Sequence, residues 1–263
     1  MILDVKEYVK QEKEKLKRKH NEPVRDMLII QIGDDKASNV YIKGKIKDVE
    51  ELGHRATLIK FNDGASTDKV YNFLEKNVGD YDGVILQEPA NFSPYSVRTK
   101  DSLLNLIPDF KDIDGFKKTG YHKPATPRGI MDYAAALGYG DLRGKIVAVV
   151  GKGKLVGKPL VPMLMEKGAT VISCNSSTPE LKNMLYQADI VIAATGVRGL
   201  IQNEMISDGT LVIDAGINVD EQGKLHGDCD PALYDREDIK ITSVPGGVGL
   251  LTRLALMKNF LGK

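Results

Sequence analysis

The stretch KIVAVVGKGKLVGKPL, Lys145 to Leu160, decides the fold of this chain. Its apolar run, Ile146 to Val150, stops at Gly151, and two more glycines and a second apolar segment follow. This order predicts a buried strand, a glycine turn and the start of a helix. Such a junction aims backbone N–H groups and the positive end of a helix dipole at one place, where a phosphate can bind. A turn that only packs a helix against a strand is the structural alternative.

The glycine spacing departs from the usual dinucleotide-binding pattern. The common fingerprint is G-x-G-x-x-G, whereas Gly151, Gly153 and Gly157 place the third glycine one residue late. Glycine lets a phosphate approach the backbone closely because it carries no side chain. The stretch therefore favours phosphate binding without naming the ligand.

The composition is that of an ordinary globular protein with one large domain or two average ones. The chain has 263 residues, of which 42% are hydrophobic and 28% charged, and its net charge is +1. This balance gives no electrostatic footprint for nucleic acid or an anionic membrane. The charge-dense segment Lys10 to His20 mixes both signs and is expected to be the solvated face of a helix.

The sequence predicts neither export nor membrane insertion. No apolar run approaches the roughly 18 residues of a membrane span, and the N-terminus lacks the continuous apolar core of a signal peptide. Cys174 and Cys229 lie far apart and form no C-x-x-C pair. We therefore expect a reducing, cytoplasmic setting.

Helical and strand patterns alternate in the first part of the chain, which predicts a parallel sheet covered by helices. Ser38 is the expected N-cap of the second helix, which Gly53 closes. The expected helices are 3–16, 38–52 and 67–77, and the expected strands are 27–32, 56–61 and 83–86.

The alternation stops between Gln87 and Arg128, where five prolines predict a seam between two units. Beyond the seam nearly all residues of the expected strands are apolar, as in a parallel sheet with both faces covered. The sequence therefore predicts two α/β units. In the second, helices are expected at 129–137, 180–188 and 250–260, and strands at 146–150, 170–173, 190–193 and 210–214.

Four polar residues of the first unit are candidates for chemistry. Tyr41 and Lys45 lie four residues apart on a predicted helix and share one face. They form either a proton-handling pair or an ordinary surface pair. Gln87 and Glu88 follow a predicted strand, at the edge where α/β proteins bind ligands. Gln87 can orient a lysine or a substrate amide, and Glu88 is either a solvated carboxylate or a substrate contact.

Three further motifs contain residues that could bind a ligand. In KDIDGF, residues 111–116, Asp114 either accepts two parallel N–H bonds from a ligand or caps a turn. In HGDCD, residues 226–230, the spacing matches no zinc or calcium pattern, so no metal site is expected. SVPGGVGLLT, residues 243–252, either covers a ligand with backbone or only connects two elements.

Seven ordered segments together resemble the bifunctional methylenetetrahydrofolate dehydrogenase/methenyltetrahydrofolate cyclohydrolase family. The resemblance covers nearly the whole chain, and the motif set is specific. The segments are ASNVYIKGK (37–45), GVILQEP (83–89), KDIDGF (111–116), PATP (124–127), GKGKLVGKP (151–159), VIDAGIN (212–218) and PGGVG (245–249).

The resemblance implies two α/β domains with a ligand cleft between them, and a homodimer. Residues 1–120 with 244–263 would form the folate-binding catalytic domain, and residues 121–243 a Rossmann-type NAD(P)-binding domain. It implies two reactions: oxidation of 5,10-methylenetetrahydrofolate to 5,10-methenyltetrahydrofolate with NADP, then hydrolysis to 10-formyltetrahydrofolate. The expected partners are tetrahydrofolate derivatives and a second copy of the chain, with no nucleic acid, membrane or metal.

The resemblance also assigns roles in the folate site. Lys45 matches the catalytic lysine, Tyr41 the tyrosine that packs on the folate, and Gln87 the glutamine that tunes the lysine. Asp114 matches the aspartate that holds the amino edge of the pterin. Because all four are present, both activities are expected. The other expected substrate contacts are Pro245, Gly246 and Gly247.

For the cofactor, the turn matches a family sequence that usually reads Gly-Arg-Ser. Lys152 therefore keeps a cation without the guanidinium fork, and Gly153 loses a hydroxyl. Ser176 matches a serine near the adenosine 2′-phosphate, and Ile217 a residue on the nicotinamide side. NADP is the expected cofactor because Lys152 and Ser176 can still meet a phosphate, and NAD stays possible. The full expected set is Gly151, Lys152, Gly153, Ser176, Thr195, Gly196 and Ile217.

Two departures concern the folate site and leave alternatives open. Glu88 stands where an apolar residue usually lines the pocket, and Leu250 where a proline usually follows the last glycine. These changes would permit an NAD(P)-dependent dehydrogenase of another small substrate. A non-catalytic nucleotide-binding module is a further possibility. The presence of all four folate-site residues, from Tyr41 to Asp114, argues against it.

Overall fold

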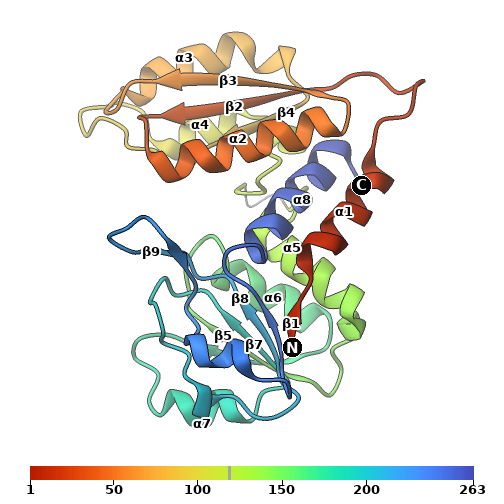
Figure 1. Cartoon of the computed structure of the whole chain (residues 1–263). Coiled ribbons are helices and arrows are strands. Elements are labelled where there is room, and N and C mark those ends of the chain that lie inside the picture. The colour runs from red at the N-terminus through yellow and green to blue at the C-terminus, as the bar shows by residue number, and fades with distance from the viewer. Residues whose placement is uncertain (118–119) are drawn as a thin grey trace. The chain divides into compact units, whose positions relative to one another are not determined.

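The computed structural model describes residues 1–117 and 120–263 (Figure 1). These residues divide into two compact units. The smaller unit comprises residues 12–125 and 255–263, and the larger comprises residues 1–11 and 126–254. The helices α1 (Val5–Leu16) and α8 (Val248–Leu261) are therefore divided between the units, and the first residue of α5 (Ala125–Ala134) belongs to the smaller one.

The smaller unit holds a three-stranded parallel sheet in the order β3-β2-β4. Its elements are β2 (Asp26–Ile32), α2 (Lys36–Glu51), β3 (Arg55–Phe61), α3 (Thr67–Asn77), β4 (Gly83–Leu86) and α4 (Lys100–Leu106). In β2, Met27 and Ile29 pack with residues of α2 and α8, whereas Leu28 and Ile30 pack with residues of α3 and α4. Helices thus cover both faces of the sheet, which explains why β2 is almost entirely apolar.

The larger unit holds a six-stranded parallel sheet in the order β1-β11-β8-β7-β5-β6. Its strands are β1 (Ile2–Leu3), β5 (Ile146–Val150), β6 (Thr170–Cys174), β7 (Ile190–Ala193), β8 (Leu211–Asp214) and β11 (Lys240–Thr242). A separate antiparallel pair joins β9 (Asn218–Val219) to β10 (Leu225–His226). The helices are α5 (Ala125–Ala134), α6 (Gly157–Glu166) and α7 (Leu181–Tyr186).

The order of these strands creates a switch point between β5 and β7. The chain runs from β5 through α6 to β6 on one side of β5, and then crosses to β7 on the other side. Val150 at the end of β5 pairs with Cys174 of β6 and with Ala193 of β7. In open α/β sheets, ligands bind outside the carboxyl ends of the strands at such a point.

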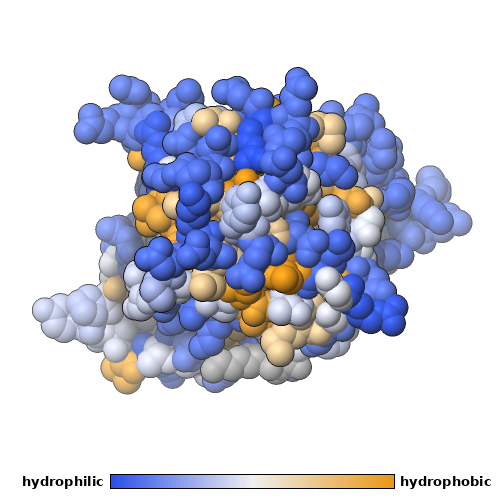
Figure 2. All heavy atoms as spheres, turned by 90° about the horizontal axis from the view of Figure 1, so that it is seen from below, coloured by the Kyte–Doolittle hydropathy of each residue, from blue (hydrophilic) through white to orange (hydrophobic). Residues whose placement is uncertain are grey.

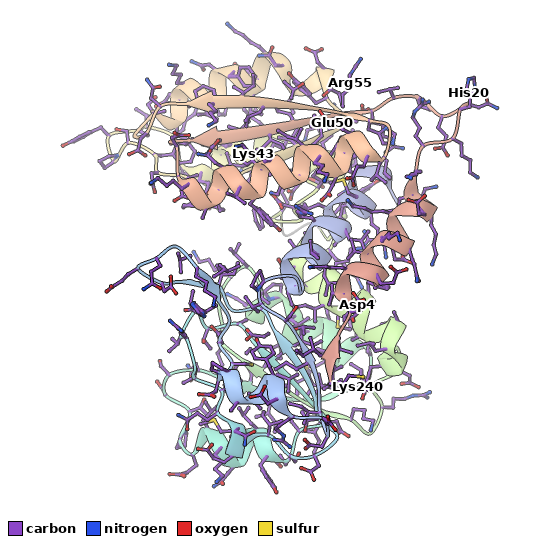
Figure 3. The ribbon with its side chains drawn as sticks, in the orientation of Figure 1. Asp4, His20, Lys43, Glu50, Arg55 and Lys240 are labelled. Carbon is purple, nitrogen blue, oxygen red and sulfur yellow. The ribbon has the colours of Figure 1, made fainter. Side chains whose placement is uncertain are left out.

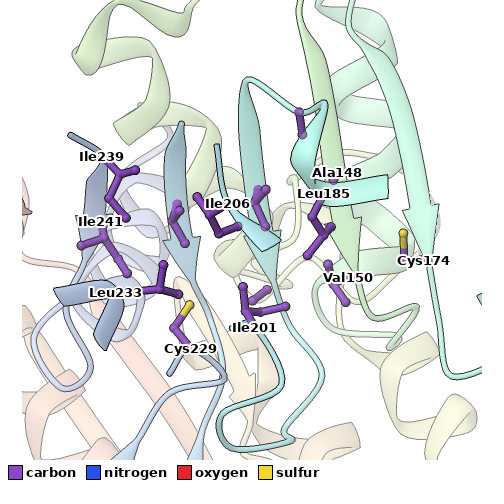
Figure 4. Packing of buried hydrophobic residues seen from close by; sticks show 14 residues of the cluster. Ala148, Val150, Cys174, Leu185, Ile201, Ile206, Cys229, Leu233, Ile239 and Ile241 are labelled. Atoms are coloured by element: carbon purple, nitrogen blue, oxygen red, sulfur yellow. The ribbon is translucent and has the colours of Figure 1, made fainter. Parts of the chain in front are cut away.

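One face of this sheet carries the hydrophobic cluster shown in Figure 4. Both cysteines, Cys174 and Cys229, lie in it as buried, free thiols. Burial raises the pKa of each thiol, so both stay protonated at neutral pH and serve as core residues.

The surface in Figure 2 is mostly hydrophilic, with apolar side chains in small patches. Scattered apolar side chains are normal on a protein surface. Over residues 1–117 and 120–263, no helix has both the length and the apolar character needed to cross a membrane.

Every expected strand is confirmed to within one residue, whereas several helix ends are not. Ser38 is not the N-cap of α2: the helix begins two residues earlier, and Asp35 Oδ1 accepts from the Ser38 N–H over 2.7 Å. The helix expected at 129–137 begins at Ala125, because Pro127 is tolerated in a first helical turn. The irregular stretch contains an unexpected helix, α4, capped by Thr99.

The N-terminal segment also differs from expectation. The first helix begins at Val5 because Ile2 and Leu3 form β1, which pairs in parallel with β11. This pairing places residues 1–11 in the larger unit, although the sequence assigned them to the first domain. Residues 244–254 likewise belong to the larger unit.

Candidate functional site

A first group of polar residues surrounds the buried amino group of Lys45 on α2. Lys45 is 2% exposed, and its Nζ donates to Gln87 Oε1 over 2.9 Å. The same Nζ lies 5.0 Å from the centroid of the Tyr41 ring. Tyr41 and Lys45 thus share one helix face, as their spacing predicted, and Gln87 meets them from the sheet.

The position of Gln87 is determined by β4 and by its own side-chain amide. Its backbone N–H donates to the Ile30 carbonyl over 2.9 Å, which extends the sheet pairing one residue beyond β4. Its Nε2 donates to the Glu88 carbonyl over 2.6 Å. Because the amide nitrogen is engaged there, the amide oxygen faces Lys45 as an acceptor.

Asp114 joins this group from the loop beside β4. Asp112 forms a parallel β-bridge with Val84, which places the loop against the sheet. Burial raises the pKa of Asp114, and the positive charge of Lys45 opposes that rise. Lys45 and Asp114 are therefore close enough to interact electrostatically.

The turn-capping role considered for Asp114 belongs to Asp112. The Asp112 carboxylate accepts from the Lys117 N–H over 2.7 Å. Asn259 on α8 donates to the carbonyls of Ile113 and Lys123, over 2.7 and 3.1 Å. The neighbours of Asp114 thus hold the loop in place.

Glu88 is an ion-paired residue, 29% exposed in its side chain, beside the Lys45 group. It pairs with Lys100, the first residue of α4, and accepts from the Ala90 N–H over 3.1 Å. Lys100 also opposes the rise in the pKa of Asp114. The charge that replaces an apolar family residue is therefore compensated within the fold.

In the larger unit the glycine turn lies at the switch point. Gly151 has φ 107°, and a Cβ atom on it would lie 2.2 Å from the Ala194 carbonyl oxygen. A Cβ atom on Gly157 would lie 1.8 Å from the Gly151 carbonyl oxygen. These two glycines are therefore required for packing, whereas a Cβ atom on Gly153 would meet nothing within 4 Å. A turn built this way leaves room at Gly153 for a bound phosphate.

Lys152 and Ser176 follow the ends of neighbouring strands, β5 and β6, and both are exposed. The Lys152 charge opposes the rise in the pKa of Cys174, the last residue of β6. Because Val150 pairs with Cys174, Lys152 and Ser176 each lie two residues beyond the same edge of the sheet. A cation and a hydroxyl at this edge are suited to a phosphate.

The other expected cofactor residues lie along the same edge. Thr195 and Gly196 follow β7, and Ile217, which is 69% exposed, follows β8. The backbone N–H groups of Thr195 and Gly196 donate to the carboxylate of Asp228, over 2.6 and 3.2 Å. The sequence suggested no binding role for Asp228, which stands in HGDCD, the motif whose spacing matches no metal site.

His226 and Asp230, the other polar residues of that motif, have local roles. His226 contacts Asp220 over 2.7 Å, and Asp230 accepts from the Ala232 N–H over 2.8 Å. In the part of the chain that the structure describes, no three His, Cys, Asp or Glu residues are grouped as metal ligands.

The expected substrate residues Pro245, Gly246 and Gly247 precede α8 in the larger unit. Gly246 has φ 99°, and a Cβ atom on Gly247 would lie 2.3 Å from the Ser243 carbonyl oxygen. The turn therefore requires both glycines. Its residues and the Lys45 group belong to different compact units.

Comparison with known proteins identifies the family. Residues 2–114 match "Tetrahydrofolate dehydrogenase/cyclohydrolase, catalytic domain", and residues 124–263 match the "NAD(P)-binding domain" of the same family. A relative from Fusobacterium nucleatum, "Bifunctional protein FolD", is 36% identical, with 98% of this chain and 93% of the relative aligned.

Solved structures of the same family resemble this chain over nearly its whole length. A crystal structure of the bifunctional enzyme FolD from Campylobacter jejuni has a TM-score of 0.88 at 32% identity, covering 100% of this chain and 97% of that one. A Trypanosoma brucei FolD structure, described as complexed with NADP cofactor and inhibitor, has a TM-score of 0.86 at 26% identity, covering 99% and 96%.

The parallel sheets and the glycine turn at the switch point define an α/β enzyme with a Rossmann-like nucleotide-binding unit. The chain belongs to the tetrahydrofolate dehydrogenase/cyclohydrolase family. The expected family, fold class and enzyme class, a dehydrogenase and cyclohydrolase of tetrahydrofolate derivatives, are thereby confirmed.

The different surroundings of the three glycines give a testable prediction. Gly157→Ala should lower the melting temperature by about 5–10 °C, because overpacking against a backbone carbonyl costs about 2–3 kcal/mol. Gly153→Ala is the matched control and should shift it by less than about 2 °C. Thermal unfolding followed by circular dichroism measures both, and equal shifts would contradict this account of the turn.

Proposed function

We propose that this chain oxidises 5,10-methylenetetrahydrofolate with NADP and hydrolyses the methenyl product to 10-formyltetrahydrofolate. The buried hydrogen bond from Lys45 to Gln87 carries the proposal. It lies in the part of the chain that matches the family's catalytic domain. An amine, an amide and a carboxylate that converge in one buried place can hold a polar ring and transfer a proton.

In the first reaction the chain's task is to bind and orient two flat rings. The glycine turn would receive the diphosphate of the cofactor, and Thr195, Gly196 and Ile217 would line its nicotinamide side. When bound, the cofactor supplies a hydride acceptor. Asp114 would accept N–H bonds from the amino edge of the pterin, and Tyr41 would pack on its ring.

In the second reaction, water adds to the methenyl carbon and the bond from that carbon to one ring nitrogen breaks. Lys45 would take a proton from the attacking water and return one to the departing nitrogen. Gln87 would hold the amine by accepting from Nζ, since its own Nε2 is engaged with the Glu88 carbonyl. Pro245, Gly246 and Gly247 would contribute backbone to the folate site.

Replacement of Lys45 tests this assignment. Lys45→Ala should lower the cyclohydrolase rate by about 10²–10⁴-fold, because the proton-transfer group is lost. NADPH binding, followed by the fluorescence of the reduced nicotinamide, should be unchanged. The cyclohydrolase rate is measured from the decay of methenyltetrahydrofolate absorbance.

Lys43→Ala is the matched control, since Lys43 is an exposed lysine on the same helix (Figure 3). It should leave both the rate and the binding unaltered. Full cyclohydrolase activity in a folded Lys45→Ala protein would refute the proposed role.

We propose NADP as the preferred cofactor because Lys152 and Ser176 can meet its 2′-phosphate. The exposed ammonium near the end of β6 supports this choice. The Trypanosoma brucei relative, described with NADP, is consistent with it. A lysine can neutralise the phosphate but binds it less specifically than the arginine usual at this position.

Initial rates with NADP and NAD test cofactor choice. Wild-type protein should prefer NADP, and Lys152→Ala should raise the KM for NADP by about tenfold, the loss of one charge-assisted hydrogen bond. The KM for NAD, which lacks the phosphate, should not change. Lys154→Ala removes another exposed lysine of the turn and should have no effect. A wild-type preference for NAD would overturn the proposal.

We also propose that the chain forms a homodimer and acts in the cytoplasm. Two buried, free cysteines are consistent with a reducing compartment. Light scattering coupled to gel filtration should give twice the chain mass of 28.9 kDa. A mass equal to one chain at micromolar concentration would contradict the dimer.

A further inference from the structure

One carboxylate in the larger unit holds two separate loops, and none of the assigned roles uses it. Asp228 has no exposed surface and stands between β10 and the short turn at Pro231–Asp235. Its Oδ2 accepts from the Thr195 N–H at 2.6 Å, from Thr195 Oγ1 at 2.8 Å and from the Gly196 N–H at 3.2 Å. Its Oδ1 accepts from Asn218 Nδ2 at 3.0 Å.

These bonds connect the loops that follow two adjacent strands. Thr195 and Gly196 follow β7, and Asn218 follows Ile217 in the segment after β8. Both loops begin at the carboxyl edge of the sheet, beside the glycine turn. A Cβ atom on Gly216 would lie 2.2 Å from Asp228 Oδ1, so glycine is needed for the carboxylate to reach the second loop.

A second buried carboxylate holds Asp228 itself. Asp214, the last residue of β8, accepts from the Asp228 N–H at 3.0 Å and from the Cys229 N–H at 2.9 Å. A Cβ atom on Gly227 would lie 2.0 Å from Asp214 Oδ2, so this approach too requires glycine. The position of Asp228 is thus determined by the rigid end of a central strand.

The four donors require a carboxylate at this position. Both of its oxygens accept, whereas an asparagine would direct an N–H₂ group at one set of donors. A buried donor that loses its acceptor is costly, so the loop would move to satisfy it. Replacement of Asp228 by asparagine should therefore displace one of the two loops.

We propose that Asp228 is a positioning residue for the nicotinamide end of the cofactor. Asp228 positions the cofactor by holding Thr195 and Gly196 in one fixed arrangement relative to Ile217 and Asn218. The inference rests on the proposed assignment of these loops to the cofactor. It predicts that loss of Asp228 weakens cofactor use and spares hydrolysis, whose proton-transfer group, Lys45, lies in the other compact unit.

The test compares Asp228→Asn with Asp230→Asn, a neighbouring acid whose side chain accepts from the Ala232 N–H. Asp228→Asn should raise the KM for NADP in methylenetetrahydrofolate oxidation by about 10- to 100-fold, which corresponds to a loss of about 1.4–2.8 kcal/mol of binding free energy. Asp230→Asn should not change it. The hydrolysis rate of methenyltetrahydrofolate should be unaltered in both proteins.

Thr195→Val provides a milder variant in case Asp228→Asn does not fold. It removes the hydroxyl, which donates to Asp228 and accepts from the Val197 N–H, and it should raise the same KM by about threefold to tenfold.

Unchanged KM values for NADP in folded Asp228→Asn, or in Thr195→Val if the first variant does not fold, would overturn the inference. Amide hydrogen exchange at Thr195 and Gly196, measured without cofactor, shows whether Asp228 holds this loop. The KM for NADP shows separately whether that loop positions the cofactor. Faster exchange with an unchanged KM would mean that Asp228 holds the loop without positioning the cofactor, which also overturns it. Failure of the cofactor assignment itself would appear differently, as wild-type protein without saturable dependence on NADP or NAD.

Discussion

The backbone hydrogen bonds between parallel strands place the carboxyl ends of all strands of a sheet at one edge, and both candidate sites depend on this alignment. In the smaller unit, Gln87 extends β4 by one paired residue and so reaches Lys45. In the larger unit, the glycine turn after β5 contacts the first loop residues after β7. Residues far apart in the chain thus meet because the strands before them are paired in register.

Two buried polar groups, the Lys45 amine and the Asp228 carboxylate, each have partners of matching type. The Lys45 amine donates to an amide oxygen, and the Asp228 carboxylate accepts only from N–H and O–H donors. The glycines at 216 and 227 belong to the same arrangement, because a side chain there would collide with a carboxylate. Motifs that look like ligand loops in the sequence therefore also serve the packing of buried charge.

The strands β2 to β8 could be predicted almost residue by residue because runs such as Ile146–Val150 are apolar throughout and are bounded by glycine or charge. The short strands β9, β10 and β11 were not expected from the sequence. Helix starts were harder, since Asp35 and Ser38 are both good capping residues and only the fold selects Asp35. The short strand β1 could not be predicted, because its partner β11 lies more than two hundred residues away. Helix α4 was not predicted because the prolines on either side of it made the whole stretch 87–128 look irregular.

The sequence by itself determined the family, the two α/β units and the identity of Tyr41, Lys45, Gln87 and Asp114 as candidates, because these depend on local pattern and on ordered motifs. Only the tertiary structure decided which residues are partners. It showed that Asp112 rather than Asp114 caps the turn, that Glu88 is ion-paired with Lys100, and that Asp228 joins two loops. Such choices depend on distances between segments remote in the chain, which no local pattern encodes.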